Sequence, residues 1–244
     1  MAKITSLIKY QGSIDGVTID KNGTVKMSPK SRTVTAERTK ENNSEFATSA
    51  KQGKTIRDSL RVLGVGDKYL SSRMVKAVRS GITLDDTNER GKRILSNNEA
   101  KTVLKGFELN GNINLSSIAP IKINLTISDT ETTIDLKNLT DNPVTIRDLF
   151  PPQGTTHIMA VGLASTININ PDILTVKEVK AVQSGKVNGN NPISLPIISY
   201  PTLEREELLI IAIALKFYQE VNGDHYQLQN GQHDVAKILD LFYL

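Results

Sequence analysis

The stretch ELLIIAIALKFYQEVNG, residues 207–223, decides the class of fold. Its apolar run, residues 208–215, ends at Lys216 and is shorter than the roughly 18 apolar residues that a membrane-spanning helix needs. Asn222-Gly223, which closes the stretch, is typical of a tight turn between antiparallel strands. We therefore predict a central β-strand that is covered on both faces or borders an interface.

From about residue 101 to residue 244 the sequence alternates with a period near two. The alternating segments are separated by Asn-Gly dipeptides and prolines, which are typical of turns. The expected strands are 100–110, 121–127, 132–139, 156–170, 174–185, 207–223, 225–231 and 235–244. About six to eight short strands with frequent turns predict an antiparallel, immunoglobulin-like β-sandwich over residues 101–244, and hence an α+β fold for the whole chain.

Residues 1–35 predict a separate small element, a β-hairpin followed by an extended arm. The apolar residues that alternate around Asn22-Gly23 are Ile14, Val17, Ile19, Val25 and Met27. The basic segment from residue 28 to about Thr35 contains Pro29, so we expect it to be extended rather than helical. A hairpin on its own is marginally stable in water, and it therefore needs a surface of this chain or of a neighbour to pack against.

Residues 36–100 predict a basic helical segment. Its main helix is expected over RTKENNSEFATSAKQGKTIRDSLR, residues 38–61, because apolar or small residues recur there every three or four positions. This stripe continues to Leu63, and its candidates for packing or for an interface are Phe46, Ala50, Gly53, Ile56 and Leu60. The small residues of the stripe allow another backbone to approach closely. Two shorter helices are expected near 70–80 and over 86–97, the latter capped by Asp85 or Asp86.

Positive charge predominates in the first part of the chain. Residues 1–105 contain 21 Lys and Arg against 11 Asp and Glu, whereas residues 106–244 contain 9 against 15. This asymmetry indicates an anionic partner, or attraction between the basic part of one copy and the acidic part of another, or simply a solvated surface. The candidates for contact with nucleic acid or with an acidic partner are Arg38, Lys40, Lys51, Lys54, Arg57 and Arg61.

The sequence shows no set of residues that points to an enzyme. It contains no cysteine, and its three histidines, His157, His225 and His233, lack the i, i+4 spacing of a helical zinc site. His157 lies at the start of a predicted core strand and is expected to be structural, whereas His225 and His233 flank a turn across which they could meet. A nucleophile elbow and a phosphate-binding loop are also missing from the sequence. We therefore expect no catalytic residue, cofactor, metal site, small-molecule substrate or membrane association.

Two stretches resemble signatures of one protein family. RTKENNSEFATSAKQGKTIRDSLR is similar to the Thr-Arg-Glu-Asn-x-x-Glu-Phe…Gly-Lys-x-x-Arg signature of an uncharacterised family that is frequent in Bacteroidetes genomes, and FYQEVNGDHYQLQNGQHDVAKIL, residues 217–239, is similar to its C-terminal signature. AKTVLKGFELN and GTTHIMAVGLAS resemble the strand that opens its β domain and its central strand. The stretch GSIDGVTIDKNGTVKMSPK departs from the aromatic strand and the Arg-Lys-Gly-Gly tail that the family usually shows. The resemblance implies a shared fold, no catalytic residue and an association with phage-like or mobile DNA.

These observations predict a non-enzymatic structural or assembly protein that self-associates or joins other structural subunits, and we expect it in a phage or phage-like virion. The N-terminal arm, the opposite charges of the two parts and a β-sandwich without catalytic residues support it. The alternative is an accessory protein that binds nucleic acid without sequence specificity through the basic N-terminal half. In the basic helical segment, however, only Phe46 and Tyr69 are available to stack on bases. MAKITSLIKYQGS, residues 1–13, shows no apolar stretch before a cleavage site, so we expect cytoplasmic synthesis without a signal peptide.

Overall fold

The computed structural model describes residues 2–3, 12–14, 16–27 and 36–243 of the chain. The chain divides into two compact units, residues 1–40 and residues 41–244. The extended arm expected over residues 28–35 lies outside the described residues. Most of the expected helical segment and all of the expected β domain fall together in the second unit.

The first unit contains a small antiparallel sheet. Its strands are β1 (Ala2–Lys3), β2 (Gly12–Ile14), β3 (Val17–Ile19) and β4 (Thr24–Met27), in the order β1-β4-β3-β2. The hairpin predicted around Asn22-Gly23 joins β3 to β4 and is confirmed. Asp20 stabilises the turn, because its carboxylate accepts hydrogen bonds from the backbone N–H groups of Asn22 and Thr24, both at 2.9 Å.

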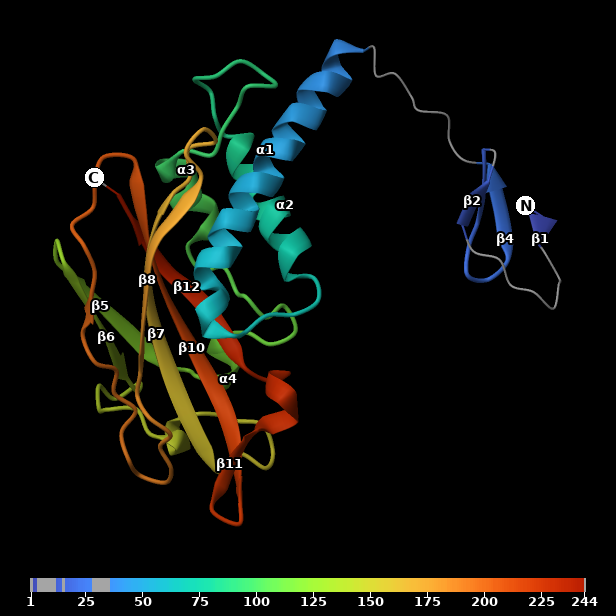
Figure 1. The fold of residues 1–244 in the computed structure, drawn as a ribbon. Coiled ribbons are helices and arrows are strands. Elements are labelled where there is room, and N and C mark those ends of the chain that lie inside the picture. The colour runs from blue at the N-terminus through green and yellow to red at the C-terminus, as the bar shows by residue number, and fades with distance from the viewer. Residues whose placement is uncertain (1, 4–11, 15, 28–35, 244) are drawn as a thin grey trace. The chain divides into compact units, whose positions relative to one another are not determined.

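The second unit combines helices with two antiparallel sheets (Figure 1). Its α-helices are α1 (Glu37–Leu60), which begins in the first unit, α2 (Leu70–Ile82), α3 (Asn97–Leu104) and α4 (Leu115–Ile118). Short 3-10 helices are η1 (Arg61–Leu63), η2 (Ile146–Asp148) and η3 (Leu228–Gly231). The five-stranded sheet comprises β7 (His157–Asn168), β8 (Thr175–Gln183), β10 (Glu207–Val221), β11 (Asp224–Gln227) and β12 (Val235–Phe242). The three-stranded sheet comprises β5 (Lys122–Ile127), β6 (Glu131–Lys137) and β9 (Ile198–Ser199). The predicted mixture of helices with antiparallel sheets is thus confirmed.

β10 is the central strand of the five-stranded sheet. It pairs with β7 on one side and with β12 and β11 on the other, and β8 extends the sheet beyond β7. Asn222 and Gly223, with φ of 55° and 89°, form the two-residue turn to β11, which needs positive φ at both positions. The predicted central strand is confirmed, and among the described residues no helix is long and apolar enough to cross a membrane.

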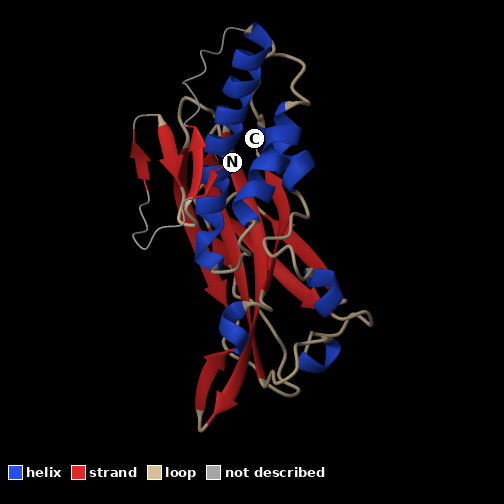
Figure 2. Ribbon diagram, turned by 90° about the vertical axis from the view of Figure 1, so that its right-hand side faces the viewer, coloured by secondary structure: helices blue, strands red, loops and turns tan. Residues whose placement is uncertain are grey.

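Alternate residues of β10 enter two different hydrophobic cores. The residues that pack with α1, α2 and α3 are Leu208, Ile210, Ala212 and Ala214. The residues that pack with β6 and α4 are Leu209, Ile211, Ile213 and Leu215. Each of these eight residues has an exposed fraction of 0%, so β10 is covered on both faces, as predicted. Figure 2 looks onto the helices that cover one of these faces. Because burial of a Leu or Ile side chain contributes about 1.5–3 kcal/mol, this strand holds both layers together.

The helix predicted over residues 86–97 is wrong. Residues 85–96 form an irregular loop, and α3 begins only at Asn97. Asp85 is buried, and its carboxylate accepts hydrogen bonds from the N–H groups of Thr87, Asn88 and Ile94 at 3.0, 3.1 and 3.0 Å. Burial alone would raise the pKa of Asp85, but these hydrogen bonds hold it well below its ordinary value of 3.8. The bonds to Thr87 and Asn88 are those that the N-cap residue of a helix also accepts. The N–H of Ile94, however, donates to this side chain and not to the carbonyl group four residues before it, as a helix would require.

The strand predicted over residues 100–110 is wrong for its first half, which is helical in α3. Ala100, Val103, Leu104 and Phe107 follow the i, i+3, i+4, i+7 spacing of a helix face, and all four belong to or pack against the helix-covered core. The second half is extended and adds to β12, because the N–H of Leu109 donates to the carbonyl of Ala236 at 2.8 Å.

Candidate interfaces and their chemistry

The second half of α1 places its predicted stripe in the core of the protein. Gly53, Ile56 and Leu60 are buried, the latter two with exposed fractions of 0% and 2%. A Cβ atom at Gly53 would lie 3.5 Å from the backbone of Val75 in α2, which is an ordinary van der Waals distance. The backbone that approaches these small and apolar residues therefore belongs to α2 of the same chain.

Between residues 45 and 52, α1 buries different residues from those predicted. Phe46 has an exposed fraction of 51%, with the guanidinium group of Arg79 5.8 Å from its ring centre, and Ala50 is half-buried. The buried positions beside them are occupied by polar residues, among them Glu45 and Gln52. Phe46 is therefore a surface residue that another molecule can contact.

Glu45 and Gln52 hold distant segments against α1. The Gln52 amide nitrogen donates to the carbonyl groups of Leu95 at 3.2 Å and Ile169 at 2.7 Å, and its oxygen accepts from the N–H of Leu95 at 3.3 Å. The Glu45 carboxylate accepts from the N–H of Gly91 at 2.9 Å. Because these partners come from elsewhere in the chain, the sequence of α1 alone gives no sign that its polar residues are buried.

The six cations proposed to contact an anion or an acidic partner differ in their surroundings. In the second unit Lys51, Lys54 and Arg61 are exposed, and none of them forms an ion pair with a described carboxylate. Arg38 and Lys40 are also exposed and belong to the first unit. Five of the six cations are therefore available to a partner.

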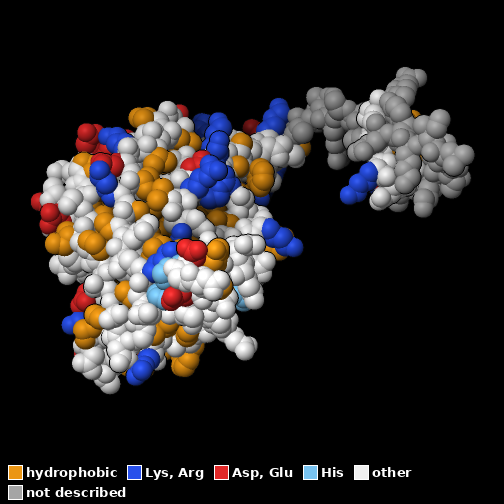
Figure 3. Space-filling model, turned by 60° about the horizontal axis from the view of Figure 1, so that its bottom comes forward, with side chains coloured by type: hydrophobic (Ala, Val, Ile, Leu, Met, Phe, Trp, Pro, Cys, Tyr) orange, Lys and Arg blue, Asp and Glu red, His pale blue; other side chains and the backbone are white. Residues whose placement is uncertain are grey.

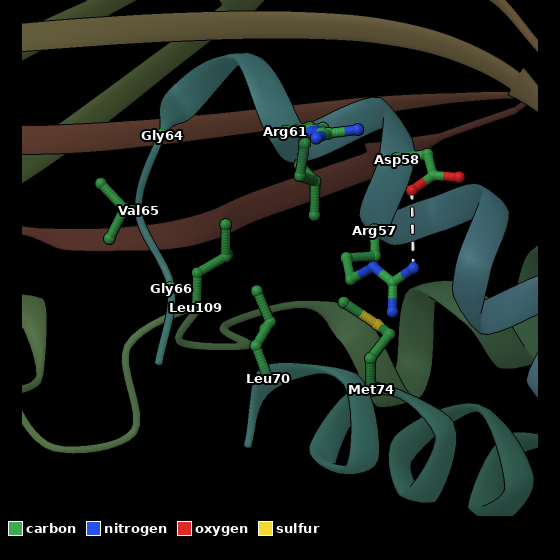
Figure 4. A pocket seen from close by; sticks show the side chains of 10 residues that line it. Arg57, Asp58, Arg61, Gly64, Val65, Gly66, Leu70, Met74 and Leu109 are labelled. Carbon is green, nitrogen blue, oxygen red and sulfur yellow. Dashed lines mark ion pairs between the residues drawn. The ribbon is translucent and has the colours of Figure 1, made fainter. Parts of the chain in front are cut away.

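A pocket of about 450 Å³ lies at the C-terminal end of α1 (Figure 4). It is lined by Arg57, Asp58, Leu60, Arg61, Gly64, Val65, Gly66, Leu70, Met74 and Leu109. Arg57, the sixth candidate cation, is half-buried; it forms an ion pair with Asp58 at 3.6 Å and donates a hydrogen bond to the hydroxyl of Ser71. The lining residues include no nucleophile and no second acid or base to act with Asp58. The pocket therefore suits a packing contact better than a reaction.

His225 lies next to His157 and not next to His233, the residue that it was expected to meet. His225 of β11 contacts His157 of β7, with ring centroids 4.2 Å apart, and Glu220 of β10 lies beside them. His233, the partner considered for His225, instead has its Nε2 atom 2.6 Å from the side-chain oxygen of Gln229. Figure 3 shows histidine side chains next to acidic ones on this end of the molecule. The contact between His157 and His225 could not be predicted from the sequence, because it depends on the register of β7, β10 and β11.

The N-terminal sheet has one apolar and one polar face. Cross-strand pairing places on one face Val17, Ile19, Val25 and Met27. The opposite face carries Ser13, Thr18 and Lys26. None of residues 12, 13 and 16–27 is buried, and Met27 has an exposed fraction of 82%. A sheet of this size needs more apolar burial than this to be stable.

Comparison with other proteins gives no assignment. The chain matches no protein-family model, no curated protein and no solved structure. Its function is therefore inferred from its own residues and their geometry.

Proposed function

We propose that the protein is a non-enzymatic structural subunit that assembles with copies of itself, or with other structural subunits, through its N-terminal sheet. The observation that carries this proposal is the apolar face formed by Val17, Ile19, Val25 and Met27, which is half-exposed or exposed. A second apolar surface on this face supplies the burial that the sheet requires. Full burial of a Val or Met side chain contributes about 1.5–3 kcal/mol, so a few such residues are sufficient to stabilise both the sheet and the association.

Charge supports the same proposal. Lys51, Lys54 and Arg61 are exposed without a described carboxylate partner, while residues 106–244 carry 15 acidic against 9 basic residues. Complementary charges on two copies accelerate their encounter and favour one relative orientation. A second copy of the chain is therefore the partner that we favour.

The proposal also covers the type of β-sandwich, the protein family and the assembly to which the subunit belongs. The two antiparallel sheets that share a core with α4 support an immunoglobulin-like sandwich for β5–β12. The resemblance of residues 38–61 and 217–239 to the Bacteroidetes family supports membership of that family. We propose, on this resemblance, a subunit of a phage or phage-like virion.

Sedimentation velocity over a wide range of protein concentrations tests self-assembly. Wild type should form larger species as its concentration rises, and Met27→Lys should shift the protein towards monomer because it places a charge on the apolar face. Lys26→Gln changes the neighbouring residue on the opposite face, so it should behave like wild type. A wild-type monomer at every concentration, or equal association of Met27→Lys and wild type, would contradict the proposal.

The second candidate function is non-specific binding of nucleic acid by the exposed Lys51, Lys54 and Arg61. Binding through phosphate contacts should be strongest at low salt, and each cation that contacts a phosphate contributes about 0.9 to the slope of log affinity against log salt concentration. Replacing all three by Gln should therefore reduce the slope by about 2.7 without affecting the core. Failure of the wild-type protein to bind duplex DNA at low salt would exclude this function.

A further inference from the structure

We propose that His157, Glu220 and His225 form a binding site for a divalent transition-metal ion such as Zn²⁺. Each residue offers one ligand atom, and the three atoms all lie within 4.8 Å of one another. The Nε2 atom of His157 is 3.8 Å from a carboxylate oxygen of Glu220. Zn²⁺ accepts two imidazoles and one carboxylate and leaves its fourth position to water or to another molecule. Two nitrogen ligands disfavour Ca²⁺ and Mg²⁺, which prefer sites made of oxygen.

Three neighbouring strands bring the ligands to one face of the sheet. Glu220 of β10 pairs directly with His225 of β11, and His157 of β7 pairs with Tyr218, two residues before Glu220. Because residues i and i+2 of a strand point to the same side, all three ligand side chains share that side. Their backbone positions are set by the strand ladders, which favours a preorganised site.

The hydrogen bonds around His157 leave its Nε2 atom available to an ion. The hydroxyl oxygen of Thr156 lies 3.0 Å from Nδ1 of His157 and 3.4 Å from the carbonyl oxygen of Tyr218, and it accepts the N–H of Glu220 at 2.8 Å. A hydroxyl group donates one hydrogen and accepts at two lone pairs. All three contacts are satisfied when the hydroxyl donates to Tyr218 and accepts the Nδ1 hydrogen of His157. Nε2 then carries a free lone pair, and metal-bound histidines usually donate their other ring hydrogen in this way.

His225 supplies an independent observation. Its Nε2 atom is buried and has no hydrogen-bond partner in the described part of the chain. The edge-to-face contact with His157, at an interplanar angle of 84°, does not provide one. A buried polar atom without a partner is unfavourable, and an ion bound to this nitrogen would remove the deficit.

The geometry permits coordination with small movements. Four-coordinate Zn²⁺ with bonds of about 2.0–2.1 Å places its ligand atoms about 3.4 Å apart. The Glu220 side chain has an exposed fraction of 45%, so its carboxylate is free to rotate towards the two rings. Once bound, the ion would connect the β10–β11 hairpin to β7 and stabilise this end of the sheet.

Isothermal titration of the full chain with Zn²⁺, after removal of metal with a chelator, tests this site. We expect one ion per chain and a higher unfolding temperature with Zn²⁺ than with chelator. Thr156→Val removes a group that orients a metal ligand, and such a loss weakens metal binding by roughly 10–100-fold. His225→Gln and Glu220→Gln each remove a ligand itself, so they should weaken Zn²⁺ binding by more than this. Co²⁺ in place of Zn²⁺ should give the intense visible absorption of a four-coordinate ion.

His233→Gln is the matched control, because His233 lies outside the cluster and should not affect the affinity. Unfolding temperatures measured with chelator show whether each variant still folds. Since Glu220 is half-exposed, Glu220→Gln provides a test even if a histidine variant is unstable. Absence of Zn²⁺ binding by wild type would overturn the proposal. Equal loss of affinity in His225→Gln and His233→Gln would also overturn it, because it would indicate scattered surface histidines instead of this cluster.

Discussion

Replacing Ile56 by alanine tests how α1 packs on the sheet. Ile56 has an exposed fraction of 0% and belongs to the core shared by the helices and β10. The substitution removes three carbon atoms, which at about 0.8 kcal/mol each corresponds to a transfer term of about 2.4 kcal/mol. The remaining cavity adds to this term, so we expect a loss of about 3–4 kcal/mol in the free energy of unfolding.

Phe46→Ala is the matched comparison on the same helix. Its side chain has an exposed fraction of 51%, so about half of the usual 1.5–3 kcal/mol for a buried aromatic side chain should be lost. The contact with Arg79 adds about 0.5 kcal/mol, which gives a total of about 1–2 kcal/mol. Urea unfolding followed by circular dichroism measures both values. A loss for Phe46→Ala as large as that for Ile56→Ala would refute the orientation of α1 described above.

Three further substitutions test buried polar groups by the same unfolding assay. Asp85→Asn should cost about 2–3 kcal/mol at neutral pH, because the carboxylate accepts several hydrogen bonds. Its pKa is lowered, so this contribution exists above the ordinary value of 3.8 and is lost as the pH falls below it; the difference from wild type should shrink in acid. Burial raises the pKa of Asp234 despite a hydrogen bond from the N–H of Phe217, so the ionised form is destabilised. Asp234→Asn should therefore become more stable relative to wild type as the pH rises from about 4 to 7. Gln52→Leu should cost about 1–3 kcal/mol, because the buried N–H and carbonyl groups of Leu95 lose their partner.

Each of these three predictions would be contradicted by a different result. A difference between Asp85→Asn and wild type that does not change in acid would show that the charge of Asp85 contributes nothing. A stability of Asp234→Asn relative to wild type that falls with rising pH would contradict the assigned direction of the pKa shift. An unchanged stability of Gln52→Leu would show that its hydrogen bonds are replaced by water.

Elements with a strong local signal could be predicted from the sequence. The run 208–215 is apolar throughout because both faces of β10 are covered, and the Asn222-Gly223 turn needs the positive φ that these two residues tolerate. The helix over residues 38–61 was also correctly located, within one residue of α1 at each end. In these places, local propensity and tertiary packing favour the same conformation.

Features that depend on distant partners could not be predicted. α1 buries Glu45 and Gln52 because Gly91, Leu95 and Ile169 supply their hydrogen bonds. The loop after Asp85 has the acidic start of a helix, but that carboxylate also binds a backbone N–H nine residues later. The histidine cluster likewise depends on the register of β7, β10 and β11, which a single sequence does not give.

Thiol reactivity on the N-terminal sheet tests the central claim, assembly through its apolar face, most directly. The chain contains no cysteine, so Met27→Cys introduces a single thiol on this face and Lys26→Cys a single thiol on the opposite face. The proposal predicts that the thiol of Met27→Cys reacts quickly with a labelling reagent in dilute protein and slowly in concentrated protein, while that of Lys26→Cys reacts equally fast in both. A rate for Met27→Cys that is the same at all protein concentrations would contradict assembly through this face.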